Sequence, residues 1–125
     1  MQVSIEAGED ATVLALARRV VGGLRGRGRL GSEGPPGLVV GVQCLPRGMR
    51  QPRIWVHPQA GPEAQALANT LTTAIGASLH PGTRPGRAAV VVEALDPASV
   101  SGPEDWALDE VADRIVAGLE RVLSR

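Results

Sequence analysis

The sequence lacks several residue types, and each absence excludes a class of site. One cysteine, Cys44, excludes an internal disulfide, and two histidines, His57 and His80, are too few for a Cys/His metal framework that spacing alone would reveal. Phenylalanine, tyrosine and lysine are absent, so Trp55 and Trp106 supply all the large aromatic surface. Because no aromatics are interleaved among the arginines, the stacking platforms that bind single-stranded nucleic acid are missing.

Long apolar runs and an excess of charge are also absent. No run approaches the ~20 residues that a membrane-spanning helix needs, and the N-terminal string MQVSIEAGED lacks the basic and then apolar order of a signal peptide. We therefore expect a cytoplasmic protein that contacts no membrane. The formal net charge is zero, from 13 basic and 13 acidic residues, which argues against a nucleic-acid partner.

The length and apolar content predict one domain. The chain has 125 residues, of which 43% are hydrophobic. A chain of this length buries roughly two-thirds of its unfolded surface, which is enough for one core. Residues 25–37 have glycine or proline at nearly every second or third position, together with several arginines, so we expect a loop there within a single domain spanning residues 1–125.

Four short segments predict strands. Residues 1–6 alternate in polarity, and the runs Leu38–Val42 and Ala88–Val92 are apolar enough for two buried strands that lie side by side. Arg53–Val56 is confined by flanking prolines and predicts an edge strand.

Three segments repeat apolar residues every three or four positions, which predicts amphipathic helices. The first ends at Gly22 and Gly23, the second runs from Pro62 to about residues 79–82, and the third begins at a capping box formed by Ser101 and Glu104. The order is β-α-β-β-α-β-α. It predicts an α/β three-layer sandwich, with a mostly parallel central sheet and helices on both faces.

Charge is distributed unevenly along the chain. Between Arg18 and Arg53 eight arginines accompany one acid, whereas Glu93 to Asp113 contains seven acids and no base. This pattern predicts two surfaces that complement each other or a neighbouring subunit, so a homo-oligomer is compatible with the sequence.

Two long strings resemble a known family. The string RIWVHPQAGPEAQALANTLTTAIGASL is similar to a strand followed by a helix of the form S-x-x-LA-x-x-I-x-x-x-L. The string AAVVVEALDPASVSGPEDWALDEVADRIVAGLERVL is similar to a PAVLVE-x-GFLSN-x-x-D strand and loop with a closing helix. Both resemble the N-acetylmuramoyl-L-alanine amidases, the zinc-dependent type 3 hydrolases of the cell wall. The resemblance implies a peptidoglycan fragment as ligand.

The resemblance also assigns site residues. Active members have a catalytic glutamate at the position of Glu93 and hold zinc through a histidine after the first strand, a glutamate that starts the first helix and a histidine at the end of the central strand. Here residues 5–8 read IEAG without histidine, Glu9 stands at the position of the glutamate ligand, and Gln43 stands at that of the second histidine. A neutral amide is a poor zinc ligand, and one remaining ligand cannot activate a metal-bound water.

We therefore expect a domain without metal or other cofactor that has lost hydrolysis and acts as a binding or regulatory module for a peptidoglycan fragment or a protein. Its binding residues are Glu9, Gln43 and Asp96, and Glu93 is the catalytic candidate. Two alternatives stay open. One is an active amidase with a rearranged zinc site that uses Glu93, Glu9 and either His57 or His80, and the other is a cytoplasmic structural or assembly protein on the same scaffold.

The strand order predicts where these residues meet. Segments that follow buried parallel strands gather at one edge of the sheet, so we expect a groove bordered by Glu9, Gln43–Cys44 and the 96–101 loop, with Glu93 inside it. Because carboxylates clustered without zinc repel one another, Glu93 should be paired with an arginine or partly protonated.

Overall fold

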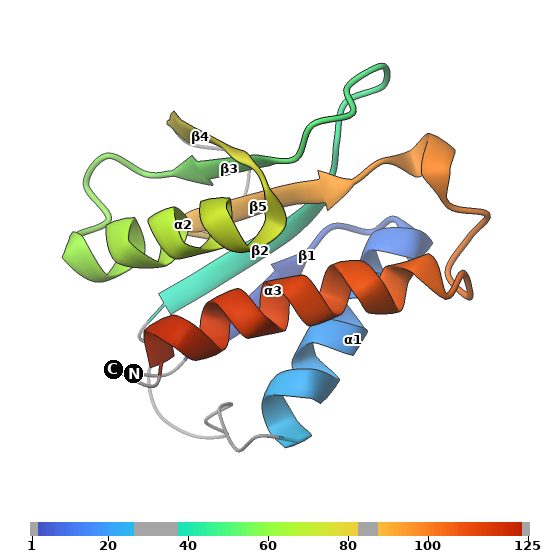
Figure 1. Ribbon diagram of the computed structural model, residues 1–125, viewed down its shortest axis with the longest axis horizontal. Coiled ribbons are helices and arrows are strands. Elements are labelled where there is room, and N and C mark those ends of the chain that lie inside the picture. The colour runs from blue at the N-terminus through green and yellow to red at the C-terminus, as the bar shows by residue number, and fades with distance from the viewer. Residues whose placement is uncertain (1–2, 27–37, 83–87, 124–125) are drawn as a thin grey trace.

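The computed structural model describes residues 3–26, 38–82 and 88–123, which form one five-stranded sheet and three α-helices (Figure 1). The elements are β1 (Val3–Ala7), α1 (Ala11–Gly26), β2 (Leu38–Cys44), β3 (Arg53–Val56), α2 (Pro62–Ile75), β4 (Ser78–Pro81), β5 (Val90–Leu95), the short 3-10 helix η1 (Pro97–Ser99) and α3 (Ala107–Leu123). Most of the loop predicted at 25–37 lies outside the described residues. No described helix is long and apolar enough to cross a membrane.

The strands lie in the order β1-β2-β5-β3-β4. β1, β2 and β5 are parallel, β3 runs antiparallel to β5, and β4 is parallel to β3. The predicted neighbours are paired, because Val40 lies opposite Val90 and Val42 opposite Val92. The mixed α/β class and the mostly parallel sheet are thus confirmed.

All three helices cover the same face of the sheet, with α3 between α1 and α2 (Figure 1). The helices approach closely at two glycines. A Cβ atom added to Gly23 would lie 2.9 Å from Val116, and one added to Gly118 would lie 2.6 Å from Leu71. One apolar core joins the three helices to the inward residues of the strands.

The other face of the sheet, which we call the second face, is covered by no described helix. This corrects the expectation of helices on both faces and leaves two layers in the described part of the chain. Strand alternation explains the difference, because successive side chains point to opposite faces. Val40 and Val42 point into the core, whereas Gly41 and Gln43 belong to the second face.

Two rows of paired residues cross the second face. The row at the carboxyl ends of β2 and β5, which we call the rim row, consists of Gln43, Glu93, Arg53 and Ser78. The row behind it consists of Glu6, Gly41, Val91, Trp55 and His80. The second face therefore carries most of the polar chemistry of the strands.

The predicted end of the second helix and the predicted edge strand are both wrong. Helix α2 ends at Ile75, because Gly76 adopts a left-handed conformation with φ of 66° and its N–H donates to the carbonyl of Thr72. The following residues form β4, which becomes the edge of the sheet and leaves β3 between β5 and β4. Strand β4 is only four residues long, and an alternation of polar and apolar residues over so short a segment does not distinguish a strand from the end of a helix.

The predicted start of the third helix is also wrong. Helix α3 begins at Ala107, whose N–H donates to Oδ1 of Asp105 at 2.9 Å. The other oxygen of Asp105 accepts the N–H of Ser101, also at 2.9 Å. Asp105 therefore caps the helix in place of the capping box of Ser101 and Glu104.

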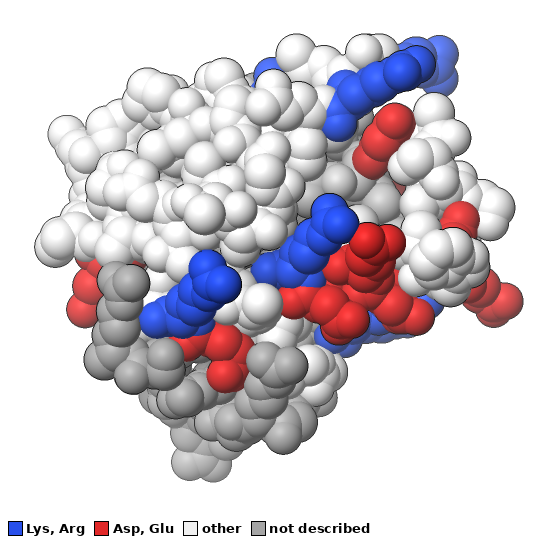
Figure 2. Space-filling view, viewed as in Figure 1, with Lys and Arg blue, Asp and Glu red and all other residues white. Residues whose placement is uncertain are grey.

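Opposite charges from distant parts of the sequence lie side by side in the fold. Figure 2 shows acidic and basic side chains intermixed on the face that carries α3. Arg19 of α1 contacts Asp109 of α3 at 2.6 Å, and Arg114 contacts Glu110 within α3 at 2.8 Å. Arg19, one of the arginines between Arg18 and Arg53, is thus paired with an acid from the segment between Glu93 and Asp113 of the same chain.

Candidate functional site

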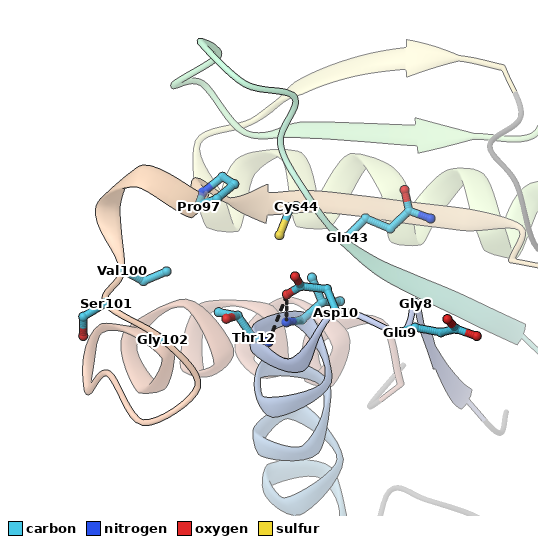
Figure 3. A pocket seen from close by; sticks show the side chains of 11 residues that line it. Gly8, Glu9, Asp10, Thr12, Gln43, Cys44, Pro97, Val100, Ser101 and Gly102 are labelled. Atoms are coloured by element: carbon cyan, nitrogen blue, oxygen red, sulfur yellow. Dashed lines mark hydrogen bonds between the residues drawn. The ribbon is translucent and has the colours of Figure 1, made fainter.

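A cavity of about 560 Å³ opens at the carboxyl ends of β1, β2 and β5 (Figure 3). The loops that leave the three parallel strands meet there with the first turn of α1. The lining residues are Gly8, Glu9, Asp10, Thr12, Val13, Gln43, Cys44, Pro97, Val100, Ser101 and Gly102. The predicted groove therefore exists, bordered by the predicted segments.

The start of α1 forms one wall of this cavity. Oδ1 of Asp10 accepts the N–H of Thr12 at 2.9 Å and that of Val13 at 3.1 Å, so Asp10 is the N-cap of the helix. Glu9, one residue earlier, is exposed and makes no hydrogen bond or ion pair to the described residues. Its carboxylate is available to a ligand.

Cys44 points toward Asp10 across the cavity (Figure 3). Burial, and to a lesser degree the negative charge of Asp10, raises the pKa of the Cys44 thiol. A thiol that stays protonated at neutral pH is a weak nucleophile. Cys44 therefore contributes a small, weakly polar surface to the cavity.

Glu93 is 2% exposed and is not among the described lining residues of the cavity; it lies on the second face and is turned toward Arg53 and Trp55. Its Oε1 accepts hydrogen bonds from Nε of Arg53 at 2.9 Å and from Nε1 of Trp55 at 2.5 Å. Nη2 of Arg53 lies 2.8 Å from the same oxygen. The predicted pairing of Glu93 with an arginine is confirmed, and its catalytic role stays a prediction.

The sequence analysis missed Arg53 and Trp55 as members of this site. Both lie on the same face of β3, two residues apart, opposite Glu93 and Val91 of β5. The alternation in the string RIWV was the available signal. It could not identify Glu93 as their partner, because the register between two strands 40 residues apart depends on the whole sheet.

Gln43 connects the cavity to the second face. It lies beside Glu93 in the rim row, and it lines both the large cavity and a smaller one of about 290 Å³ that also borders Gly41 and Val91. In Figure 3 its side chain points away from Cys44. Gln43 can therefore offer its amide to a ligand at the rim of the sheet.

Asp96 lies beside the cavity instead of lining it. Its Oδ1 accepts the N–H of Ala98 at 3.0 Å and so begins η1. It borders a separate cavity of about 350 Å³ together with Arg50. Of the four predicted site residues, Glu9 and Gln43 line the large cavity, and Glu93 and Asp96 do not.

Neither histidine reaches the cavity. His57 follows β3, whose antiparallel direction places it at the opposite end of the sheet, where its N–H donates to the carbonyl of Ala89 at 3.0 Å. His80 lies on β4, with its ring centroid 4.9 Å from that of Trp55 and Nε2 2.9 Å from the hydroxyl of Ser78. Neither can join Glu9 as a ligand to the same ion.

The side chains around the cavity do not fit a zinc site. Structural and catalytic zinc sites use at least three imidazole, thiolate or carboxylate ligands. Here Glu9 offers a carboxylate, the carboxylate of Asp10 is engaged in capping α1, Gln43 offers a neutral amide and Cys44 a single thiol. Within the described ranges, no three residues of the types His, Cys, Asp and Glu are placed to hold a metal ion.

No protein-family model matches the sequence, and no curated protein matches it. Two solved structures are similar. The N-acetylmuramoyl-L-alanine amidase AmiC2 of Nostoc punctiforme matches with a TM-score of 0.65 and 10% identity, over 99% of this chain and 98% of that one. The N-acetylmuramyl-L-alanine amidase Ami1 from Mycobacterium smegmatis matches with a TM-score of 0.70 and 15% identity, over 98% and 97%.

The chain has an amidase-like fold. At such identities the likeness concerns the fold alone, and it extends over nearly the full length of both amidase chains. The family resemblance deduced from the sequence is therefore confirmed at the level of architecture.

Proposed function

We propose that this chain is an amidase-like domain that does not hydrolyse its ligand through zinc and instead binds a peptidoglycan fragment in the large cavity. The pair Gln43 and Glu93 carries the proposal. The family resemblance assigns a zinc-binding histidine to the position of Gln43 and a catalytic glutamate to that of Glu93. Here the first position holds a neutral amide, and the carboxylate at the second is already paired with Arg53.

Electrostatics at the rim row support the loss of metal-dependent chemistry. The guanidinium of Arg53 occupies the position beside Glu93 that a cation would need. Two like unit charges about 4 Å apart repel by ~4 kcal/mol at an effective dielectric constant near 20, and a divalent ion doubles this. Because Arg53 already balances the charge of Glu93, this repulsion offsets the attraction of the carboxylate for a metal ion next to it.

The cavity itself supports a binding role. Its volume of about 560 Å³ is within the usual range of ligand sites. The lining combines the carboxylate of Glu9, the amide of Gln43 and the hydroxyl of Ser101 with apolar Val13 and Val100. Such a mixture suits the amide N–H groups, amino groups and methyl groups of a short peptide attached to a sugar.

A structural or assembly role is the second candidate, and Trp106 favours it. The indole of Trp106 is 75% exposed at the start of α3. Exposed aromatic side chains are enriched at protein–protein interfaces. If this surface mediates self-association, Trp106→Ser should shift an oligomer to monomer in light scattering coupled to size-exclusion chromatography.

The deciding experiment measures zinc content, binding and cleavage on the same preparation. We expect no stoichiometric zinc by mass spectrometry, binding of a muramoyl dipeptide by calorimetry, and no cleavage. Gln43→Ala should weaken binding about fivefold to tenfold, which corresponds to one lost hydrogen bond of ~1 kcal/mol. Gln65→Ala, an exposed glutamine on α2, is the matched control and should bind as the wild type does.

Other outcomes distinguish the alternatives. Stoichiometric zinc together with cleavage that Glu93→Gln abolishes would establish an active amidase with a rearranged site. Absence of both binding and cleavage would favour the structural role.

A further inference from the structure

A smaller cavity on the second face is rich in positive charge. It has a volume of about 320 Å³, and its lining residues are Met49, Arg50, Gln51, Arg53, Ser78 and His80. These described lining residues include two arginines and a histidine but no acid. Because Arg53 and Ser78 belong to the rim row, this cavity lies at the same edge of the sheet as the large one.

The polar side chains of this cavity are held in place by their neighbours. Arg53 is 14% exposed, and both its Nε and its Nη2 are directed at Glu93. Its guanidinium also lies 5.1 Å from the ring centroid of Trp55, against which His80 stacks. His80 is fixed further by the hydroxyl of Ser78 at 2.9 Å. Polar groups fixed in this way lose little conformational freedom when they bind a ligand.

Arg50 is a lining residue whose positive charge is not paired with an acidic side chain of the described residues. It is exposed and makes no hydrogen bond or ion pair with any described residue, although it also borders the cavity that contains Asp96. Arg53 is paired with Glu93, whereas no acid among the described lining residues balances the charge of Arg50. The lining therefore favours an anion.

We propose that this cavity binds an oxyanion, the carboxylate or phosphate group of a larger ligand. Arg50 supplies the charge and a planar set of N–H donors, and the Ser78 hydroxyl and the His80 ring supply further polar contacts. Arginine forms paired, charge-assisted hydrogen bonds with both kinds of oxyanion. Arg53, whose charge is balanced by Glu93, completes the lining without adding net charge.

The position of this site suggests how it could act together with the large cavity. Adjacent strands are about 4.8 Å apart, so Gln43 and Ser78, three strands apart in the rim row, are separated by about 14 Å. An extended peptide of about four residues spans this distance. Joint binding of one ligand rests on the proposed function, whereas the oxyanion site does not.

The two tryptophans provide a direct test. Trp106→Phe leaves Trp55, which lies against Arg53 and His80, as the single indole reporter. In this background we expect inorganic phosphate or acetate to change the Trp55 fluorescence in a saturable way. Arg50→Ala should weaken binding at least about tenfold, the loss expected for one charge-assisted hydrogen bond, and Ser78→Ala should weaken it about threefold to fivefold.

Arg114→Ala is the matched control, because Arg114 is an exposed arginine on α3. It should leave the affinity within about twofold of the wild-type value, because Arg114 is not among the described residues that line this cavity. A fluorescence response to phosphate alone supports a phosphorylated ligand, and a response to acetate alone supports a peptide carboxylate. A response to both anions supports a general oxyanion site. No saturable response to either anion, or equal losses in Arg50→Ala and Arg114→Ala, overturns the proposal whether or not the large cavity binds a muramoyl dipeptide.

Discussion

Gln43 and Glu93 lie directly opposite each other on the parallel strands β2 and β5, and Arg53 lies opposite Glu93 on its other side. The row therefore places a neutral amide, a buried carboxylate and a guanidinium on three adjacent strands. The charge of the carboxylate is balanced within the protein, by a side chain 2.8 Å away. The energetic cost of burying the carboxylate of Glu93 therefore depends on Arg53.

Removing the guanidinium should strongly destabilise the fold. Arg53→Met removes the guanidinium that lies 2.8 Å from the carboxylate of Glu93, a residue that is 2% exposed, and we expect a loss of about 3–5 kcal/mol in the free energy of unfolding. The double variant Arg53→Met with Glu93→Gln should recover a large part of this loss. Urea denaturation of both variants and of Arg114→Met, whose side chain is 56% exposed, provides the measurement and the control. Equal losses for Arg53→Met and Arg114→Met would contradict the assignment.

The close approach of α3 to α2 should depend on Gly118. A Cβ at this position would lie 2.6 Å from Cδ2 of buried Leu71 and 3.3 Å from Cβ of Ala74, so Gly118→Ala should destabilise the domain by about 1–3 kcal/mol. Gly22 in α1 is the control, since a Cβ there would meet nothing within 4 Å. Gly22→Ala should stabilise the domain by up to about 1 kcal/mol through helix propensity. Thermal unfolding that shows the same sign for both variants would refute this packing.

The reactivity of Cys44 should report on Asp10. Burial and the charge of Asp10 raise the thiol pKa, so alkylation by iodoacetamide should be slow at neutral pH and accelerate only above the usual range of thiol ionisation. Asp10→Asn removes the charge but keeps a good helix cap, and it should lower the pKa and speed alkylation. Glu9→Gln, at the adjacent residue, should have a smaller effect. Mass spectrometry over a pH series measures the rates, and an unchanged rate in Asp10→Asn would disprove the coupling.

The cap of α3 should make part of the stability depend on pH. Backbone hydrogen bonds from Ala107 and Ser101 lower the pKa of Asp105. A carboxyl group whose pKa is lower in the folded state stabilises the fold above its unfolded pKa and loses this contribution as the pH falls through the folded value. Asp105→Ala should therefore be less stable than the wild type at neutral pH, and the difference should shrink in acid. Chemical denaturation over a pH series measures the difference, and a difference that does not shrink in acid would contradict this role of Asp105.

Local patterns in the sequence were sufficient for much of the architecture. The three- and four-residue periodicity around Leu16, Leu67 and Ile115 predicted the helices, since an amphipathic helix must bury its apolar stripe. The β-branched runs predicted β2 and β5 as neighbours. The positions at which these parallel strands end then predicted the location of the cavity, because the loops that follow parallel strands meet at one edge of the sheet.

The amino-acid sequence alone predicts the three helices, the core strands and the edge of the sheet where the cavity forms. Three features depend on the folded sheet: the face on which each strand residue lies, the position of β4 at the edge, and the pairing of Glu93 with Arg53 on the second face instead of a place in the cavity lining. The reason is physical. Helix periodicity and turn chemistry act over a few residues, whereas strand register and ion pairing join residues 40 positions apart, and these depend on how the whole sheet packs.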